Sequence, residues 1–374
     1  MYRIRPRHLF VMAHALTDPH AAARLDRLLA GLGRRRPELV TITPEELPEV
    51  ITRCGWIGEV RQGAYHEPRD PDLLFTAFHW LTPEQRGELT RSELFARCHA
   101  AHTRYGDCGQ NFTAGRIQAM LGAAPFFHFE RREQWQRDLI CWSLHDIHTA
   151  WGCLHRCAYC QRGSVYVINL NVEEFGAQVD RLLTDNPWQK TIRYDVEQDV
   201  LAIEPEYGAC ELLVNQFARY DDRYLMLFTK SANVGHLLRL EHRGHTIMLW
   251  TLTPRSVSRR YEARTGSMDE RLAAARRCQE AGYPIRFKCK PIIPTRGWRA
   301  EMTEMLEAMY AQVQPENLSA EVVFFDSVAE MDATLGLDQL DPEFVEAARV
   351  AEAAPWSNDL HGPRPFPFEV KRVI

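Results

Sequence analysis

The chain has 374 residues, of which 45% are hydrophobic and 25% are charged, and its formal net charge is −5. This size and composition allow a sizeable hydrophobic core in one or two domains. The negative balance excludes a global basic field of the kind that draws a protein to nucleic acids or anionic membranes. No apolar run reaches the length of a membrane span, and the opening residues are too polar for a signal peptide, so we expect a cytoplasmic protein without a membrane partner.

Residues 1–137 are predicted to form a mostly helical N-terminal domain. Residues 18–33 have the apolar spacing of an amphipathic helix that ends at a glycine. Thr43 and Thr82 each precede a Pro-Glu pair, which is typical of a helix start. Strand signals are few in this part of the chain.

Beyond residue 138, short apolar runs alternate with helical segments. Strand candidates lie at residues 139–144, 191–197, 224–230, 246–253, 285–293 and 319–325, and helices are expected near 172–184, 208–220, 232–242, 267–281 and 299–313. Ser267 and Glu270 form a capping box for one of these helices, which Gly282 ends. Strands that alternate with helices form parallel sheets.

This order of elements predicts an α/β fold with three parts. Six strand–helix units are too few for a closed eight-stranded barrel, so residues 138–326 are predicted to form a partial barrel that follows the N-terminal domain. Residues 327–374 are predicted to be a tail of helix and loop, in which a helix begins near Asp341.

Three of the ten cysteines, Cys153, Cys157 and Cys160, have the spacing C-x3-C-x2-C. Three thiolates can hold three irons of a [4Fe–4S] cube and leave the fourth iron open, whereas cubes held by protein alone usually take four cysteines. The absence of a fourth cysteine from the motif indicates that a ligand from outside the chain binds the fourth iron. A zinc site is the alternative, but zinc usually takes four ligands, and His155 would crowd the loop rather than complete it. The other seven cysteines are expected to be buried thiols.

The triplet resembles the cluster motif of the radical SAM enzymes, in which S-adenosylmethionine (SAM) chelates the open iron. This resemblance implies a partial (β/α)6 barrel with the cluster in the loop after the first strand. Further segments resemble, in order, those of the spore photoproduct lyase-like (DNA repair photolyase-like) family. They lie at residues 194–205, 228–238, 241–246, 261–262, 271–276, 281–283 and 291–293.

The resemblance implies roles for single residues. The three cysteines would ligate the cluster, and Tyr159 would lie against SAM. Gln198, Lys230 and Thr251 fall where this family contacts SAM. Lys230 ends a strand and would pair with the SAM carboxylate; the alternative is a surface lysine.

Two positions depart from the family pattern. The family uses a cysteine as hydrogen-atom donor where this chain has Val196, and it has a tyrosine after the last cluster cysteine where this chain has Gln161. Both departures affect the path that returns hydrogen, and they indicate the same core chemistry on a different substrate.

A cluster of cations lies on the strand at 285–293. Arg286, Lys288 and Lys290 alternate, so they share one face of the strand and are candidate catalytic residues. If this face points into the barrel, the cations are costly unless they meet anions such as a phosphate, carboxylate or nucleotide. If it points outward, they form a solvated edge, and the sequence leaves both readings open.

The combined prediction is a radical SAM enzyme with a [4Fe–4S] cluster and an electron donor such as flavodoxin or ferredoxin. SAM would be cleaved reductively to a 5′-deoxyadenosyl radical that abstracts hydrogen from an anionic small-molecule or nucleotide-like substrate. Whether the enzyme is a lyase, an isomerase or an oxidoreductase is left open. One alternative is spore photoproduct lyase-like repair or modification of nucleic-acid lesions, which the acidic net charge and Val196 disfavour. Another is a non-catalytic metal-binding structural protein.

Overall fold

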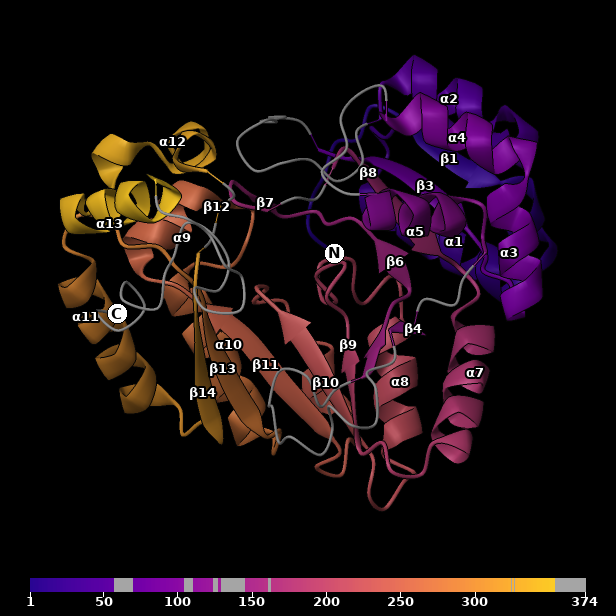
Figure 1. The fold of residues 1–374 in the computed structure, drawn as a ribbon. Helices are drawn as coiled ribbons and strands as arrows, with labels where there is room; N and C mark the ends of the chain where they lie inside the picture. Colours follow the sequence, from indigo (N-terminus) through magenta and orange to yellow (C-terminus); the bar gives the residue numbers. More distant parts are fainter. Residues whose placement is uncertain are drawn as a thin grey trace.

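The computed structural model describes residues 1–56, 70–103, 110–123, 127–128, 145–160, 163–323, 325 and 327–353. Two large β-sheets organise these residues and lie beside each other, each covered by helices (Figure 1). None of the described helices is both long and apolar enough to cross a lipid bilayer.

The larger sheet contains six parallel strands in the order β14, β13, β11, β10, β9, β5, and β4 pairs antiparallel with β5 at its edge. The α/β class and the parallel strands predicted from the sequence are confirmed. The apolar run at 139–144 lies outside the described residues. The strand bounds are β4 Phe127–His128, β5 His145–Ile147, β9 Thr191–Tyr194, β10 Tyr224–Thr229, β11 Thr246–Leu252, β13 Ile285–Ile292 and β14 Asn317–Val322.

The helices that lie between these strands along the chain are α7 Val172–Asp185, α8 Ala209–Phe217, α9 Arg255–Tyr261, α10 Met268–Glu280 and α11 Trp298–Gln312. The predicted capping box is present at α10, where the Ser267 hydroxyl accepts a hydrogen bond from the Glu270 N–H (3.3 Å) and the Glu270 carboxylate accepts one from the Ser267 N–H (2.8 Å).

The helix predicted at 232–242 is wrong, because this segment forms only a short 3-10 turn, η3 (Leu237–Arg239). The Asn233 side chain donates hydrogen bonds to the carbonyls of Leu201 (3.0 Å) and Glu204 (2.7 Å). These bonds tie the segment to a neighbouring loop and compete with a helix start.

The prediction of a mostly helical N-terminal domain is also wrong, because this region is mixed α/β. Its sheet has the order β2, β1, β3, β8, β6. In β1 (Leu9–Met12) and β3 (Asp72–Thr76) every residue is buried. Parallel strands that are covered on both faces lack the alternation by which a strand is recognised in sequence. The other elements are η1 Ala13–Thr17, α1 Pro19–Leu32, β2 Leu39–Ile42, η2 Pro44–Glu46, α2 Leu47–Cys54, α3 Pro83–Arg91, α4 Glu93–Thr103 and α5 Gln110–Met120.

The segment with the three predicted cluster cysteines begins and ends at strands of the N-terminal sheet. β6 (Ala150–Trp151) precedes it and β8 (Val165–Asn169) follows it, and both strands lie in the N-terminal sheet, where β8 pairs with β3. Within the segment, β7 (Arg156–Cys157) pairs antiparallel with β12 (Glu262–Ala263). Three further elements, α12 Val328–Leu335, η4 Leu337–Gln339 and α13 Pro342–Ala353, follow β14.

Candidate functional site

A cavity of about 410 Å³ lies where the carboxyl ends of the parallel strands face the cysteine segment. Its size falls within the usual range for small-molecule sites, and its position is the usual ligand position in parallel α/β folds. The cavity brings together nine of the residues that the sequence singled out, which are Cys153, Cys157, Tyr159, Cys160, Gln198, Lys230, Thr251, Lys288 and Lys290. Arg286 is not among its lining residues.

Backbone contacts hold the cysteine loop in place. The N–H of Ala158 donates to the carbonyl of Tyr261 (2.7 Å), next to the β7–β12 pair in which Cys157 lies opposite Glu262. Gly152 has a φ of 117°, and a Cβ there would lie 2.6 Å from the carbonyl oxygen of Val165. Glycine is therefore required directly before Cys153.

The donor set fits an iron–sulfur cube better than a single zinc ion. All three thiols line the same cavity. In the part of the chain that the structure describes, the three sulfurs of the triplet do not all lie within 4.8 Å of one another. Sulfurs on one tetrahedral zinc ion are only about 3.8 Å apart. Burial raises the pKa of Cys157 to about 12 and the pKa of Cys153 well above its usual value, and a bound metal would favour the thiolate form of both.

A buried carboxylate, Glu262, joins the cysteine loop to Lys230. It accepts hydrogen bonds from the Tyr159 hydroxyl, from Lys230 Nζ (2.9 Å) and from Thr253 Oγ1 (2.8 Å), and it pairs with the buried Arg271 (2.5 Å). Burial alone would raise the pKa of Glu262, but Arg271 and Lys230 hold it well below the usual range. Glu262 is therefore an anion that fixes two of the predicted SAM-site residues.

Lys230 is not a surface lysine, because its side chain is only 17% exposed. Besides its contact with Glu262, Nζ donates to the carbonyl of Lys290 (3.1 Å) and lies 5.8 Å from the centre of the Tyr159 ring. The ring face adds a favourable cation–π contact. These contacts hold the ammonium group at the cavity wall.

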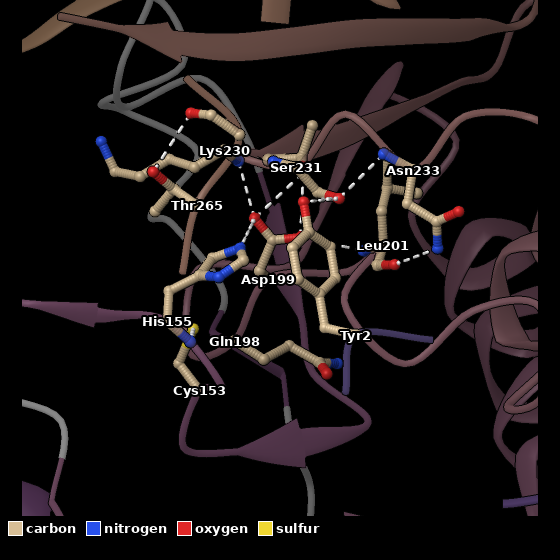
Figure 2. A network of polar contacts seen from close by, with 12 residues as sticks. Tyr2, Cys153, His155, Gln198, Asp199, Leu201, Lys230, Ser231, Asn233 and Thr265 are labelled. Carbon is tan, nitrogen blue, oxygen red and sulfur yellow. Dashed lines mark hydrogen bonds and ion pairs between the residues drawn. The ribbon is translucent and has the colours of Figure 1, made fainter. Parts of the chain in front are cut away.

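A second buried carboxylate, Asp199, organises the same wall (Figure 2). It accepts hydrogen bonds from the N–H of Lys230 (2.6 Å) and from Thr229 Oγ1 (2.9 Å), and its Oδ2 lies 3.1 Å from His155 Nε2. Burial opposes ionisation of Asp199, but His155 and the hydrogen-bond donors hold its pKa below the usual value. The ring of Tyr2 packs edge-on against His155, with 5.2 Å between ring centres.

Gln198 and Thr251 differ in what they offer a ligand. The Gln198 amide donates to Asp195 Oδ2 (3.1 Å) and Thr149 Oγ1 (3.2 Å), and its oxygen accepts from the Tyr166 hydroxyl, so its orientation is fixed by the chain itself. Thr251 Oγ1 is buried and has no hydrogen-bond partner among the described residues. A hydroxyl of this kind at a cavity wall is suited to a ligand.

The three cations of β13 lie in two different places. Lys288 and Lys290 face the cavity, and both pair with Glu321 of β14, at 3.2 Å and 2.6 Å. Arg286 lies near the start of β13, where it pairs with Glu316 (2.8 Å). Of the two alternatives from the sequence, the inward-pointing face therefore applies to Lys288 and Lys290. Both contact an anion of the chain itself, Glu321.

Two positions bear on the hydrogen-return path. Val196 lines the cavity, and the thiols in the described lining are those of the triplet. Gln161 lies outside the described residues. Sequence reasoning did not assign Glu262 or Glu321 to the site. Glu262 had a signal, because it falls in one of the segments that carry the family resemblance, whereas Glu321 had none.

Comparisons with known proteins indicate one family. The family model described as spore photoproduct lyase matches residues 143–329, which is half of the chain. Spore photoproduct lyase of Bacillus subtilis (strain 168) is 28% identical over 183 residues, covering 47% of this chain and 53% of that protein. The protein of the same name from Geobacillus sp. is 27% identical over 181 residues, covering 46% and 53%. The matched part thus spans about half the length of these curated relatives.

Solved structures are similar over more of the chain. Spore photoproduct lyase complexed with dinucleoside spore photoproduct has a TM-score of 0.59 and 16% identity, covering 92% of this chain and 86% of that one. A mutant with bound AdoMet and dinucleoside spore photoproduct has a TM-score of 0.58 at the same identity and coverage. At this identity the likeness concerns the fold.

Proposed function

The chain belongs to the spore photoproduct lyase family of the radical SAM superfamily, and from this premise we propose that it cleaves SAM reductively to start hydrogen abstraction from a nucleotide-like substrate. The observation that carries the proposal is the single cavity shared by the cysteine triplet, Lys230 and Thr251. One solved structure with a similar fold, a spore photoproduct lyase mutant, has both AdoMet and dinucleoside spore photoproduct bound.

The residues that line the cavity have different proposed roles. Cys153, Cys157 and Cys160 would hold three irons of a [4Fe–4S] cluster, which when bound supplies the electron that cleaves SAM to methionine and a 5′-deoxyadenosyl radical. Lys230, held by Glu262, presents an ammonium group for the SAM carboxylate. Thr251 presents a free hydroxyl at the same cavity.

The far wall of the cavity favours an anionic substrate. Lys288 and Lys290 share one carboxylate, Glu321, which is 34% exposed. A phosphate of an incoming nucleotide would compete with Glu321 for both ammonium groups, because charge-assisted bonds to phosphate are strong. We therefore propose lesion repair or modification in a nucleic acid or nucleotide, in the cytoplasm, with an electron donor such as flavodoxin or ferredoxin.

Val196 distinguishes this proposal from the reaction of the relatives. A thiol donates a hydrogen atom readily, whereas the apolar side chain of Val196 at this position of the cavity does not. The proposed reaction therefore shares its first half with the family and ends in a different hydrogen-return step.

The experiment starts with anaerobic reconstitution of the full chain with iron and sulfide. We expect one [4Fe–4S] cluster per chain, and a change in the electron paramagnetic resonance (EPR) spectrum of the reduced cluster when SAM is added. Cys157→Ala should lose the cluster, whereas Cys278→Ala, which removes a buried thiol of α10 outside the cavity, should retain it. If the EPR spectrum of the reduced cluster does not change when SAM is added, the result would contradict the enzyme proposal and favour a structural role.

The substrate half is tested separately with dinucleoside spore photoproduct as the probe. We expect this probe to increase formation of 5′-deoxyadenosine, and Lys290→Met to raise the probe concentration needed. SAM cleavage in which neither the photoproduct nor a plain dinucleotide changes the rate of 5′-deoxyadenosine formation would have two consequences. It would contradict the proposal of a nucleotide-like substrate, and it would still support a radical SAM enzyme.

A further inference from the structure

Three side chains of metal-binding type meet in the N-terminal sheet. They are His8 directly before β1, Cys54 at the end of α2 and Asp72 at the start of β3, and their ligand atoms all lie within 4.8 Å of one another. The strand register brings two of them together, because Leu9 of β1 pairs with Leu73 of β3. None of the three lines the cavity of the cysteine triplet.

Asp72 is held in one orientation. Its Oδ1 accepts hydrogen bonds from the N–H groups of Arg7 (3.2 Å) and His8 (3.0 Å), and its Oδ2 accepts one from Trp56 Nε1 (2.9 Å). Trp56 is fully buried against Phe10. Outer hydrogen bonds of this kind commonly fix the carboxylate ligands of metal ions.

The burial pattern leaves a route for an ion. Asp72 and Cys54 are 2% and 7% exposed, whereas the side chain of His8, whose Nδ1 lies 2.9 Å from Asp72 Oδ2, is 42% exposed. An ion can therefore enter from the histidine side, where the fourth position would remain open to solvent. This is the arrangement of three protein ligands and one open position that is common in non-structural zinc sites.

The donor set selects the class of ion. One nitrogen, one sulfur and one oxygen suit borderline divalent transition cations, whereas Ca²⁺ and Mg²⁺ prefer oxygen alone. Burial and the carboxylate of Asp72 raise the pKa of Cys54. A divalent cation would balance the charges of one thiolate and one carboxylate in this buried place.

We propose that His8, Cys54 and Asp72 form a second metal site, separate from the cluster loop, which takes one Zn²⁺-like cation. Binding would connect β1, α2 and β3, and thereby stabilise the N-terminal sheet by mass action. The proposal does not depend on the proposed function, because no residue of the cluster cavity takes part.

The test uses the full chain with Cys153→Ser, Cys157→Ser and Cys160→Ser, which removes the competing triplet, and Co²⁺ as the spectroscopic probe. We expect one Co²⁺ per chain with a thiolate-to-cobalt absorption band, displaced by Zn²⁺. Cys54→Ser should abolish the band, and His8→Ala should weaken binding by more than about tenfold. Cys98→Ser, which changes another buried thiol of the same domain, should leave the band unchanged.

Two outcomes overturn the proposal. One is a folded triple variant that binds no Co²⁺, which would mean that His8, Trp56 and Asp72 form a hydrogen-bonded group only. The other is a cobalt band that survives Cys54→Ser. If the triple variant does not fold, cluster-loaded wild-type protein is titrated with Zn²⁺, and the proposal requires a rise in thermal midpoint that His8→Ala removes and Cys98→Ser retains.

Discussion

Lys230 is the residue on which the proposed binding of SAM depends most. Lys230→Met removes the ammonium group that faces the cavity, and the loss of a charge-assisted hydrogen bond costs about 1.5–3 kcal/mol, or roughly ten- to hundredfold in affinity. We expect this weakening when SAM binding to cluster-loaded protein is measured by equilibrium dialysis. Lys190→Met is the matched control, because Lys190 is exposed and pairs with Asp222 at the surface. Equal SAM affinity in the two variants would contradict the role of Lys230.

Glu262 is the residue whose loss should destabilise the fold. Glu262→Gln preserves the shape of the side chain but leaves Arg271 and Lys230 without their buried anion. Removing one partner of a buried ion pair costs about 3–5 kcal/mol. We expect a loss of this size in the free energy of unfolding, measured with denaturant. Glu304→Gln, at an exposed pair with Arg255, should change it by about 0.5 kcal/mol or less, and an equal effect of both would argue against the network.

The residues that sequence reasoning could place are those with a local pattern or a family segment. The cysteine spacing and the family resemblance single out the triplet, Lys230 and Thr251, and in the structure all of them line one cavity. Glu321 had no such signal, because its meeting with Lys288 depends on how β14 pairs with β13. A pair formed across strands of different segments is visible only after the register is known.

At the scale of elements, α1 and α7 are connected by one ion pair. Arg24 is buried, its guanidinium meets Glu173 at 2.7 Å, and its Nε donates to the carbonyl of Tyr207 (2.7 Å). Burial would raise the pKa of Glu173, but Arg24 holds it below the usual value. The pair therefore stabilises the fold at neutral pH by a modest amount, because Glu173 is 40% exposed and partly screened by solvent.

Glu173→Gln should lower the free energy of unfolding at pH 7 by about 1 kcal/mol. Because the folded-state pKa is depressed, this contribution is present above the unfolded-state pKa of about 4.3 and is lost as pH falls through the folded-state value. The difference between variant and wild type should therefore shrink in acid when unfolding is followed at several pH values. A difference that stays constant from neutral pH into acid would contradict the ion pair as its cause.

Elements were predictable where a helix has its own signals. Ser267 with Glu270 and Thr82 with Gln85 form the capping boxes that start α10 and α3. The strands of the N-terminal sheet were missed because β1 and β3 are short and buried on both faces. Segment 232–242 was misassigned because its helical pattern is overruled by the bonds of Asn233 to another loop.

At the scale of the whole molecule, the chain passes from one sheet to the other and back around the cysteine loop. β8 follows the loop, yet it pairs with β3, and all five of its residues are buried. A fragment that begins at residue 138 lacks β1 and β3 and exposes this apolar strand edge. We expect the fragment to aggregate in size-exclusion chromatography, whereas the full chain does not. A monomeric, cooperatively folding fragment would show that the larger sheet and its helices are independent of the N-terminal sheet.

Formation of 5′-deoxyadenosine is the decisive measurement of whether the cavity of the cysteine triplet cleaves SAM. Cluster-reconstituted protein is incubated anaerobically with SAM and dithionite, and the nucleoside is quantified. We expect 5′-deoxyadenosine from the wild type and from Cys278→Ala, and none from Cys157→Ala. Reconstituted wild-type protein that carries a full cluster and yields no 5′-deoxyadenosine, with or without dinucleoside spore photoproduct, would contradict this expectation.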